Sequence, residues 1–260
     1  MTTRLNFASA FGSAIANSVA DLRRERVRPL QASCHAAAVR RRVLTLAVLP
    51  VLLVPATSHA GARTDDPPKF SATVQPIGDH LREWMTGRSW HEGCPVGFDR
   101  LRVLRLRYWG FDGRAHWGRL VVNRAFAWPI VRIFQRLYRH RRPVHRMWLV
   151  DRYGADDLTS MEHDNTSAFN CRWRAGQPGV WSMHAYGKAL DVNPLENPYV
   201  RGDHVSPPAG RKYLDRSKHA KGMIHPGDGY VRAFASIGWE WGGAWTGNEI
   251  DYQHFSSNNR

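Results

Sequence analysis

The strongest constraint on the fold is a strand–turn–strand pattern near the middle of the chain. From Leu104 to Tyr108, hydrophobic residues alternate with arginines, which is typical of a strand with one buried face. Asp112 and Gly113 form a dipeptide that favours a tight hairpin turn, so residues 116–122 are predicted to run back as a second strand. The sequence therefore predicts an antiparallel hairpin in this region.

The segment after this hairpin has the hydrophobic period of a helix. Between Asn123 and Pro143, the apolar residues at positions 127, 131, 134 and 138 share one helical face, so the main helix is predicted here. Shorter elements are predicted elsewhere, namely helices at 77–85 and 230–237 and strands at 144–150 and 251–255. Because strands and helices are mixed without regular alternation, we predict an α+β fold with a small antiparallel sheet and flanking helices.

The beginning of the chain differs in composition from the rest. Three arginines at 40–42 precede an apolar run at 43–54, and a small-residue cleavage site ending at Ala60 follows, which together describe a signal peptide. The run is shorter than the roughly 20 apolar residues that a membrane helix needs. A buried helix at 43–54 is the alternative, and the true start codon and the export route (general or twin-arginine) stay open. We predict an extension with a signal peptide at 1–60, a linker at 61–75 and one domain at 76–260.

The chain is strongly basic, with a formal charge of +15, and residues 61–260 keep 29 of its 37 basic and 20 of its 22 acidic residues. A basic surface favours polyanionic surroundings such as nucleic acid, anionic lipid or a phosphate-rich cell wall, although arginine usage can also reflect genome composition. No recognised nucleic-acid-binding motif accompanies the charge, so no nucleic-acid partner is predicted. If Cys34 is removed with the leader, Cys94 and Cys171 remain as an even pair, and a disulfide between them is predicted.

Two short stretches contain residue types that ligate metals. The first places His184 and Asp191 seven residues apart with a glycine between them, so both can reach one point if the chain turns at that glycine. Imidazole and carboxylate are good Zn²⁺ ligands, and a catalytic zinc site needs three protein ligands and an open position. The second stretch, Asp251 to Phe255, offers His254 as the third ligand and Asp251 as a proton acceptor. Because neighbouring strand positions alternate between faces, a twist or bulge must bring both to the site.

Taken singly, each of these residues also has a purely structural explanation, and their joint occurrence carries the argument. Residues 182–191 read S-M-H-A-Y-G-K-A-L-D, residues 238–245 are rich in Trp and Gly, and residues 251–254 read D-Y-Q-H. In this order they resemble the zinc D-alanyl-D-alanine carboxypeptidases and L-alanyl-D-glutamate endopeptidases, and residues 165–172 look like a lead-in found in this family. The resemblance implies the Hedgehog/DD-peptidase fold.

The same resemblance implies roles for individual residues. His184, Asp191 and His254 would bind one zinc ion per chain, and Asp251 would be the general base. The family also places an arginine near the metal, where it stabilises the negative charge that develops on the carbonyl oxygen. We assign this role to Arg172, and Arg152 is the competing candidate.

Three further side chains are interpreted with an alternative beside each. Ser182 is expected to donate a hydrogen bond to a ligand carboxylate or, alternatively, to be a turn hydroxyl. Trp241 and Trp245 are expected to form the floor of a substrate groove, with core packing as the alternative. The remaining histidines, His204 among them, are interpreted as surface or structural residues.

These observations together predict a secreted metallopeptidase of the cell wall. Its partners would be the stem peptides of peptidoglycan, with a D-alanyl-D-alanine carboxypeptidase-like activity, and the bond cleaved stays open. A monomer is expected, with no stable membrane insertion after removal of the signal peptide. The alternative function is a non-catalytic, zinc-containing wall-binding module of the same fold, because a fold alone does not guarantee an activity.

Overall fold

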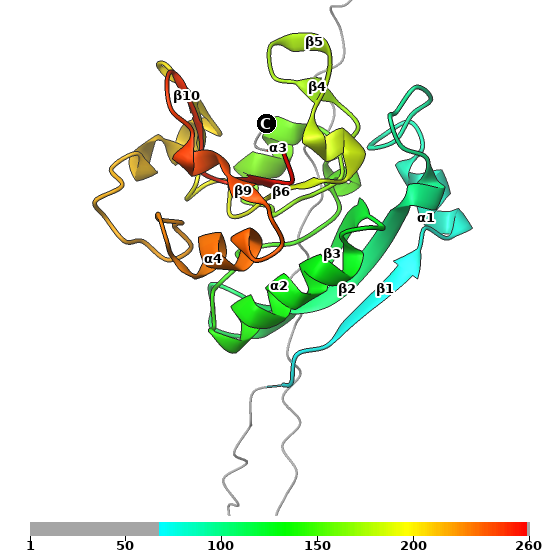
Figure 1. Ribbon diagram of the computed structural model, residues 1–260, viewed down its shortest axis with the longest axis horizontal. Helices are drawn as coiled ribbons and strands as arrows, with labels where there is room; N and C mark the ends of the chain where they lie inside the picture. Colours follow the sequence, from blue (N-terminus) through cyan, green and yellow to red (C-terminus); the bar gives the residue numbers. More distant parts are fainter. Residues whose placement is uncertain (1–67, 259–260) are drawn as a thin grey trace, which may run out of the picture. The chain divides into compact units, whose positions relative to one another are not determined.

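The computed structural model describes residues 68–258 (Figure 1). The predicted extension, the signal peptide and most of the predicted linker lie outside the described residues. Within these residues, no helix has both the length and the apolar composition needed to cross a membrane. The described part of the chain mixes helices with small antiparallel sheets, which is compatible with the predicted α+β class.

The largest sheet is a three-stranded antiparallel meander with the order β1-β2-β3. Its strands are β1 (Ala72–Pro76), β2 (Leu101–Trp109) and β3 (Ala115–Asn123), and helix α1 (Asp79–Met85) lies between β1 and β2 in the chain. The hairpin between β2 and β3 turns at the predicted Asp112-Gly113 dipeptide, with Trp109 opposite Ala115 at the end of the ladder. The predicted hairpin is therefore confirmed.

The main helix, α2 (Ala127–Arg139), packs against this meander (Figure 1). Its buried residues include Ile130, Phe134 and Leu137, and they join Leu104, Leu106 and Leu120 of the sheet in the larger hydrophobic core. Helix α4 (Gly229–Ala235) packs beside α2 and adds further aromatic residues to the same core. In Figure 1 the meander, α2 and α4 lie below the strands β4, β5 and β10 of the C-terminal half.

The C-terminal half consists of short elements. Its strands form three small antiparallel sheets. The first has the order β6 (Ala189–Asp191), β11 (His254–Ser256) and β9 (Glu240–Trp241), and the second has the order β10 (Glu249–Asp251), β7 (Tyr199–Arg201) and β8 (His204–Ser206). The third pairs β4 (Trp173–Arg174) with β5 (Gln177–Trp181). Helix α3 (Asp157–Glu162) begins at the N-cap residue Asp156, whose side chain accepts a hydrogen bond from the Thr159 amide. Short 3₁₀ helices occupy Phe98–Arg100, Val150–Tyr153, Met183–Tyr186, Pro208–Tyr213 and Gly242–Ala244.

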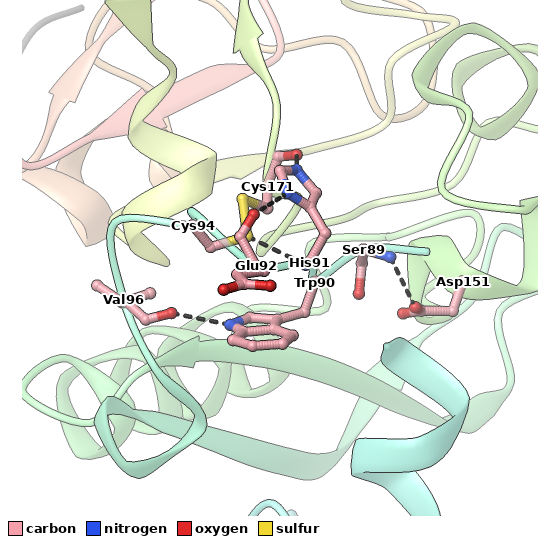
Figure 2. Close-up of a disulfide and its surroundings, with 8 residues drawn as sticks. All are labelled: Ser89, Trp90, His91, Glu92, Cys94, Val96, Asp151 and Cys171. Atoms are coloured by element: carbon pink, nitrogen blue, oxygen red, sulfur yellow. Dashed lines mark hydrogen bonds between the residues drawn. A yellow bond between two sulfur atoms is a disulfide. The ribbon is translucent and has the colours of Figure 1, made fainter. Parts of the chain in front are cut away.

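Cys94 and Cys171 form a disulfide, with their Cα atoms 5.9 Å apart (Figure 2). The loop around Cys94 is also held by hydrogen bonds: the Cys171 amide donates to the Ser89 carbonyl (2.9 Å), and the Ser89 amide donates to Asp151 Oδ1 (3.2 Å). A cross-link over a separation of 77 residues restricts the unfolded chain strongly. By loop-closure arguments it contributes roughly 4 kcal/mol to stability.

Three expectations about the elements need correction. The predicted linker ends too late, because β1 starts at Ala72 and its Ala72 and Val74 side chains pack against the core. No strand forms at 144–150, since the amides of His145 and Trp148 donate to the side-chain oxygens of Asn193 and Asn165 rather than to a neighbouring strand. The final strand predicted at 251–255 is broken after Asp251, so that β10 and β11 belong to different sheets.

Candidate metal centre

His184 is positioned by a short 3₁₀ helix and a glycine turn. The Ser182 side chain caps this helix by accepting a hydrogen bond from the His184 amide (3.3 Å). The helix ends at Gly187, which has a φ of 65° and lies so close to β3 that an added Cβ would be 2.6 Å from the Asn123 nitrogen. Only glycine fits a left-handed position with this close approach. The turn leads directly into β6, which ends with Asp191.

The pairing of β6 with β11 brings the segment 251–254 beside the segment 184–191. In this antiparallel ladder His254 lies directly opposite Asp191, although 63 residues separate them. Residues 252–253 form a bend between β10 and β11, which breaks the alternation of a single strand. The bend allows Asp251 and His254 to line the same pocket, and it is the irregularity that the motif spacing required.

The three predicted ligands converge on one point. His184 Nε2 is 3.2 Å from His254 Nδ1 and 3.1 Å from Asp191 Oδ2, and His254 Nδ1 is 3.0 Å from Asp191 Oδ1. All three side chains are buried, with 2–6% of each residue exposed. Ligands about 2.0–2.2 Å from a tetrahedral Zn²⁺ are themselves separated by about 3.3–3.6 Å. The observed separations are slightly smaller, so a small outward adjustment would accommodate the ion.

The tautomer of His184 suits metal binding. Its Nδ1 is 2.5 Å from the carbonyl oxygen of Ala168, so in a neutral imidazole this nitrogen is the donor. Nε2 then carries a lone pair toward His254 and Asp191. An orienting hydrogen bond from the other ring nitrogen is the usual support for a metal-bound histidine. The residues present therefore fit a divalent cation with mixed nitrogen and oxygen ligands.

A second group of metal-ligand types consists of His91, Cys94 and Cys171 (Figure 2). Both of its sulfur atoms are consumed by the disulfide. Since metals bind the thiolate form of cysteine, this group offers no comparable set of donors in the oxidised chain. Within residues 68–258, the His184, Asp191 and His254 group is therefore the better metal site.

The carboxyl groups of the site have opposite electrostatic environments. Burial opposes the ionisation of Asp191, but the adjacent His184 and His254 outweigh it and lower the pKa of Asp191. Burial, assisted by the Asp191 carboxylate, raises the pKa of Asp251 to about 7, against the opposing effects of His254, Gln253 and Arg172. One oxygen of Asp251, Oδ1, is enclosed without a hydrogen-bond partner in the described part of the chain. Asp251 can thus exchange a proton near neutral pH.

Arg172 is one of two arginines, with Arg174, that line the pocket among the described residues. It forms an ion pair with Asp157 at the start of α3, with Nη2 2.8 Å from Oδ2. Burial alone would lower the pKa of Arg172, but the surrounding carboxylates, led by Asp157 and Asp191, raise it, so the guanidinium stays charged. The competing Arg152 lies elsewhere, over the ring of Trp148 at 3.9 Å, and is absent from the pocket lining.

The site opens into a cavity of about 370 Å³. Ser182 and Trp245 line it, and the Trp245 ring lies 5.7 Å from the His254 ring. The expected groove role of Trp241 needs correction, because Trp241 is not part of this lining. Trp241 is a core residue, 5% exposed, with its indole nitrogen donating to the Tyr252 carbonyl. The Ser182 hydroxyl accepts a hydrogen bond from the His184 amide, which agrees with the alternative of a turn hydroxyl.

Several pocket residues were not anticipated from the sequence. Asp157, which holds Arg172, carries no signal beyond an ordinary acidic helix start. Tyr199 lies opposite Asp251 in the β7–β10 ladder, and its hydroxyl donates a hydrogen bond to Oε1 of Glu249 (2.9 Å). His204 also lines the cavity, although its sequence context suggested only a surface residue. Asp157 reaches the pocket through the packing of α3, and Tyr199, His204 and Glu249 reach it through the pairing of β7, β8 and β10. Neither kind of contact leaves a local pattern in the sequence.

Comparison with known proteins supports the family inferred from the motifs. Residues 175–257 match a family described as D-alanyl-D-alanine carboxypeptidase. The predicted family is thereby confirmed over a segment that includes His184, Asp191, Asp251 and His254, whereas Arg172 lies just before it. This segment is therefore similar to a peptidase. No curated protein and no solved structure matches the chain significantly.

Proposed function

We propose that this chain is an exported zinc peptidase that hydrolyses peptide bonds in the stem peptides of peptidoglycan. The observation that carries the proposal is the convergence of His184, Asp191 and His254 beside a proton-exchanging Asp251, within the segment that matches the carboxypeptidase family. Two histidines, one carboxylate and an adjacent open cavity are the features of a catalytic rather than a structural zinc site.

When bound to these ligands, zinc would lower the pKa of a water molecule and polarise the carbonyl group of the scissile peptide. The buried ligand set fixes where this chemistry takes place, and the cavity leaves access for a peptide. Among the residues of the chain, the Ala168 carbonyl keeps the His184 ring in one orientation.

Asp251 is proposed as the general base. In its ionised form it accepts the proton of the attacking water, and it then delivers this proton to the leaving amine. The pKa of about 7 favours both halves of this transfer near neutral pH. Arg172, held by Asp157, is proposed to donate to the carbonyl oxygen as negative charge develops there. A single donor of this kind typically lowers the barrier by about 3 kcal/mol.

The substrate and the location follow from the family description and from the N-terminal sequence. A D-alanyl-D-alanine carboxypeptidase acts on the end of a wall peptide, so the proposed substrate is a stem peptide, and the proposed fold is the Hedgehog/DD-peptidase fold. A wall enzyme must be exported, which agrees with the signal-like run at 43–54 and with a disulfide in the domain.

The test is mass analysis of purified muropeptides after incubation with the zinc-loaded domain. Loss of one alanine from pentapeptide stems would identify carboxypeptidase activity, and cleavage after the first L-alanine would identify an endopeptidase. A protein that binds zinc and wall fragments but leaves every stem peptide intact would contradict the enzyme and establish the non-catalytic wall-binding module.

A further inference from the structure

A second cavity, of about 280 Å³, lies between the C-terminal end of α2 and the start of α4. Both helices belong to the lower part of Figure 1, whereas the elements around the metal centre, α3, β4 and β10, lie in the upper part. The cavity shares no lining residue with the metal pocket. Its lining consists of Arg136, Leu137, His140, Arg142, Gly229 and Arg232.

The lining is cationic and has no carboxylate. In the described part of the chain, none of the three arginines forms an ion pair with an aspartate or glutamate. The nearest acidic residue in sequence, Asp228, is already used as the N-cap of α4: its Oδ1 accepts from the amides of Tyr230 and Val231, and its Oδ2 accepts from the His225 amide. Three guanidinium groups therefore surround one cavity without internal neutralisation.

Two of the arginines are held in place by the fold. The Arg232 guanidinium donates to the Gly227 carbonyl. Arg142 packs directly against Gly229, where an added Cβ would be 2.7 Å from its Nε atom. Because these side chains are already ordered, a ligand loses less affinity to their immobilisation. Because Gly229 has no side chain, the Arg142 guanidinium can lie against its backbone beside the cavity.

We propose that this cavity binds a phosphate group carried by a small ester, such as one unit of an anionic phosphodiester polymer. Planar guanidinium groups match phosphate oxygens in pairs, and several of them favour a multi-oxygen anion over a single carboxylate. A volume of about 280 Å³ has room for the phosphate and an attached group. Among the described residues, the imidazole of His140 is the only ring in the lining, and no tryptophan, tyrosine or phenylalanine is present there to stack successive nucleobases, so a base-free polymer is favoured over nucleic acid.

The binding is testable without any hydrolysis assay, so its outcome is independent of the proposed peptidase function. Isothermal calorimetry at constant ionic strength is carried out with inorganic phosphate, with a short oligomer of glycerol phosphate and with oligo(dT). We expect the glycerol phosphate oligomer to bind best and inorganic phosphate to bind more weakly at the same site. Acetate serves as the control anion. If oligo(dT) bound as tightly as the glycerol phosphate oligomer or more tightly, the proposal of a base-free ligand would be wrong. If none of the phosphate compounds bound more tightly than acetate, the proposal of a phosphate site would be wrong.

Two matched pairs of substitutions distinguish binding in this cavity from nonspecific attraction to a basic protein surface. Arg142→Gln with Arg232→Gln removes two charges from the cavity, and Arg132→Gln with Arg139→Gln removes two exposed charges from α2 outside it. The first pair is expected to weaken binding of the glycerol phosphate oligomer at least tenfold, and the control pair less than twofold. Equal losses would show diffuse attraction and reject the site.

A third variant leaves the net charge unchanged. Gly229→Ala places a methyl group against the Arg142 guanidinium and must displace it, while the backbone at this position accepts alanine. We expect binding to weaken several-fold. Wild-type affinity in Gly229→Ala would mean that the position of Arg142 is irrelevant, which contradicts the proposal.

Discussion

The meander β1–β2–β3 with α2 and the segment around the metal centre are built in different ways. The meander has two nine-residue strands paired along their whole length, and its side chains alternate between the core and the other face. The candidate metal centre rests on strands of two or three residues and on 3₁₀ turns, and the contacts of His254 with Asp191 and His184 join residues 63 and 70 positions apart. The meander and α2, here called the platform, are regular secondary structure, and they support a site that is assembled from short and irregular elements.

The largest expected effect of a single change is at the metal centre. His184→Ala removes one of three metal ligands and leaves the buried Asp191 without one of its two neighbours. We expect loss of stoichiometric zinc and of peptide hydrolysis to the uncatalysed background. Metal analysis and a stem-peptide assay on the same preparation measure both. A variant that keeps one zinc per chain and its activity would show that the ligand set is wrong.

A second prediction sharpens the comparison between platform and site. Leu106→Ala and Phe255→Ala each create a cavity in the larger core, and each should lower the free energy of unfolding by about 2–5 kcal/mol. Leu106 lies in the meander, so its variant should keep the wild-type zinc affinity. Phe255 directly follows the ligand His254 and stacks on Phe234, so its variant should also bind zinc more weakly.

Urea denaturation of the metal-free proteins and competition with a chelator measure the two quantities separately. The expected pattern is similar destabilisation with zinc affinity reduced only in Phe255→Ala. If Leu106→Ala weakened zinc binding as much, the platform and the site would be one cooperative unit, and the division drawn between them would fail.

The same contrast decides how much the sequence could predict. Alternation at 104–108 and the helical period at 127–138 are local signals, and they identified the β2–β3 hairpin and α2. His184, Asp191, Asp251 and His254 were found through their motifs, whose spacing reflects a short turn and a bend. Residues whose position depends on long-range pairing could not be found in this way.

Asp157 illustrates this limit. Its ion pair with Arg172 depends on how α3 packs beside residues 171–173, and a single sequence carries no record of that packing. The misassigned strand at 144–150 has a related cause. Its apolar residues have the composition of a strand, but asparagine side chains from distant segments satisfy its amides.

A further expected effect concerns the pH dependence of stability. Burial raises the pKa of Glu196 to about 8, and the neighbouring Asp164 contributes to the rise. The folded chain therefore holds this proton more tightly than the unfolded chain, whose glutamate has an ordinary pKa of 4.5. The resulting stability is fully present below pH 4.5 and is lost as the pH rises through about 8.

Glu196→Gln keeps the group neutral at every pH and should flatten this dependence. Between pH 5 and pH 8 the wild type is expected to lose about 3–4 kcal/mol relative to the variant. Urea denaturation of metal-free protein across this range measures the difference, with the exposed Glu162→Gln as the control. Parallel pH profiles for wild type and Glu196→Gln would exclude the buried proton.

The central claim is that three residues hold the metal while a fourth performs the proton transfer, and Asp251→Asn tests it most directly. This change keeps the size of the side chain and removes its ability to accept a proton. Zinc content and hydrolysis of a stem peptide are measured on the same preparations of wild type and variant. The account predicts one zinc per chain in both and a turnover lowered by about 10²–10⁴ in the variant. Wild-type turnover in Asp251→Asn would contradict it.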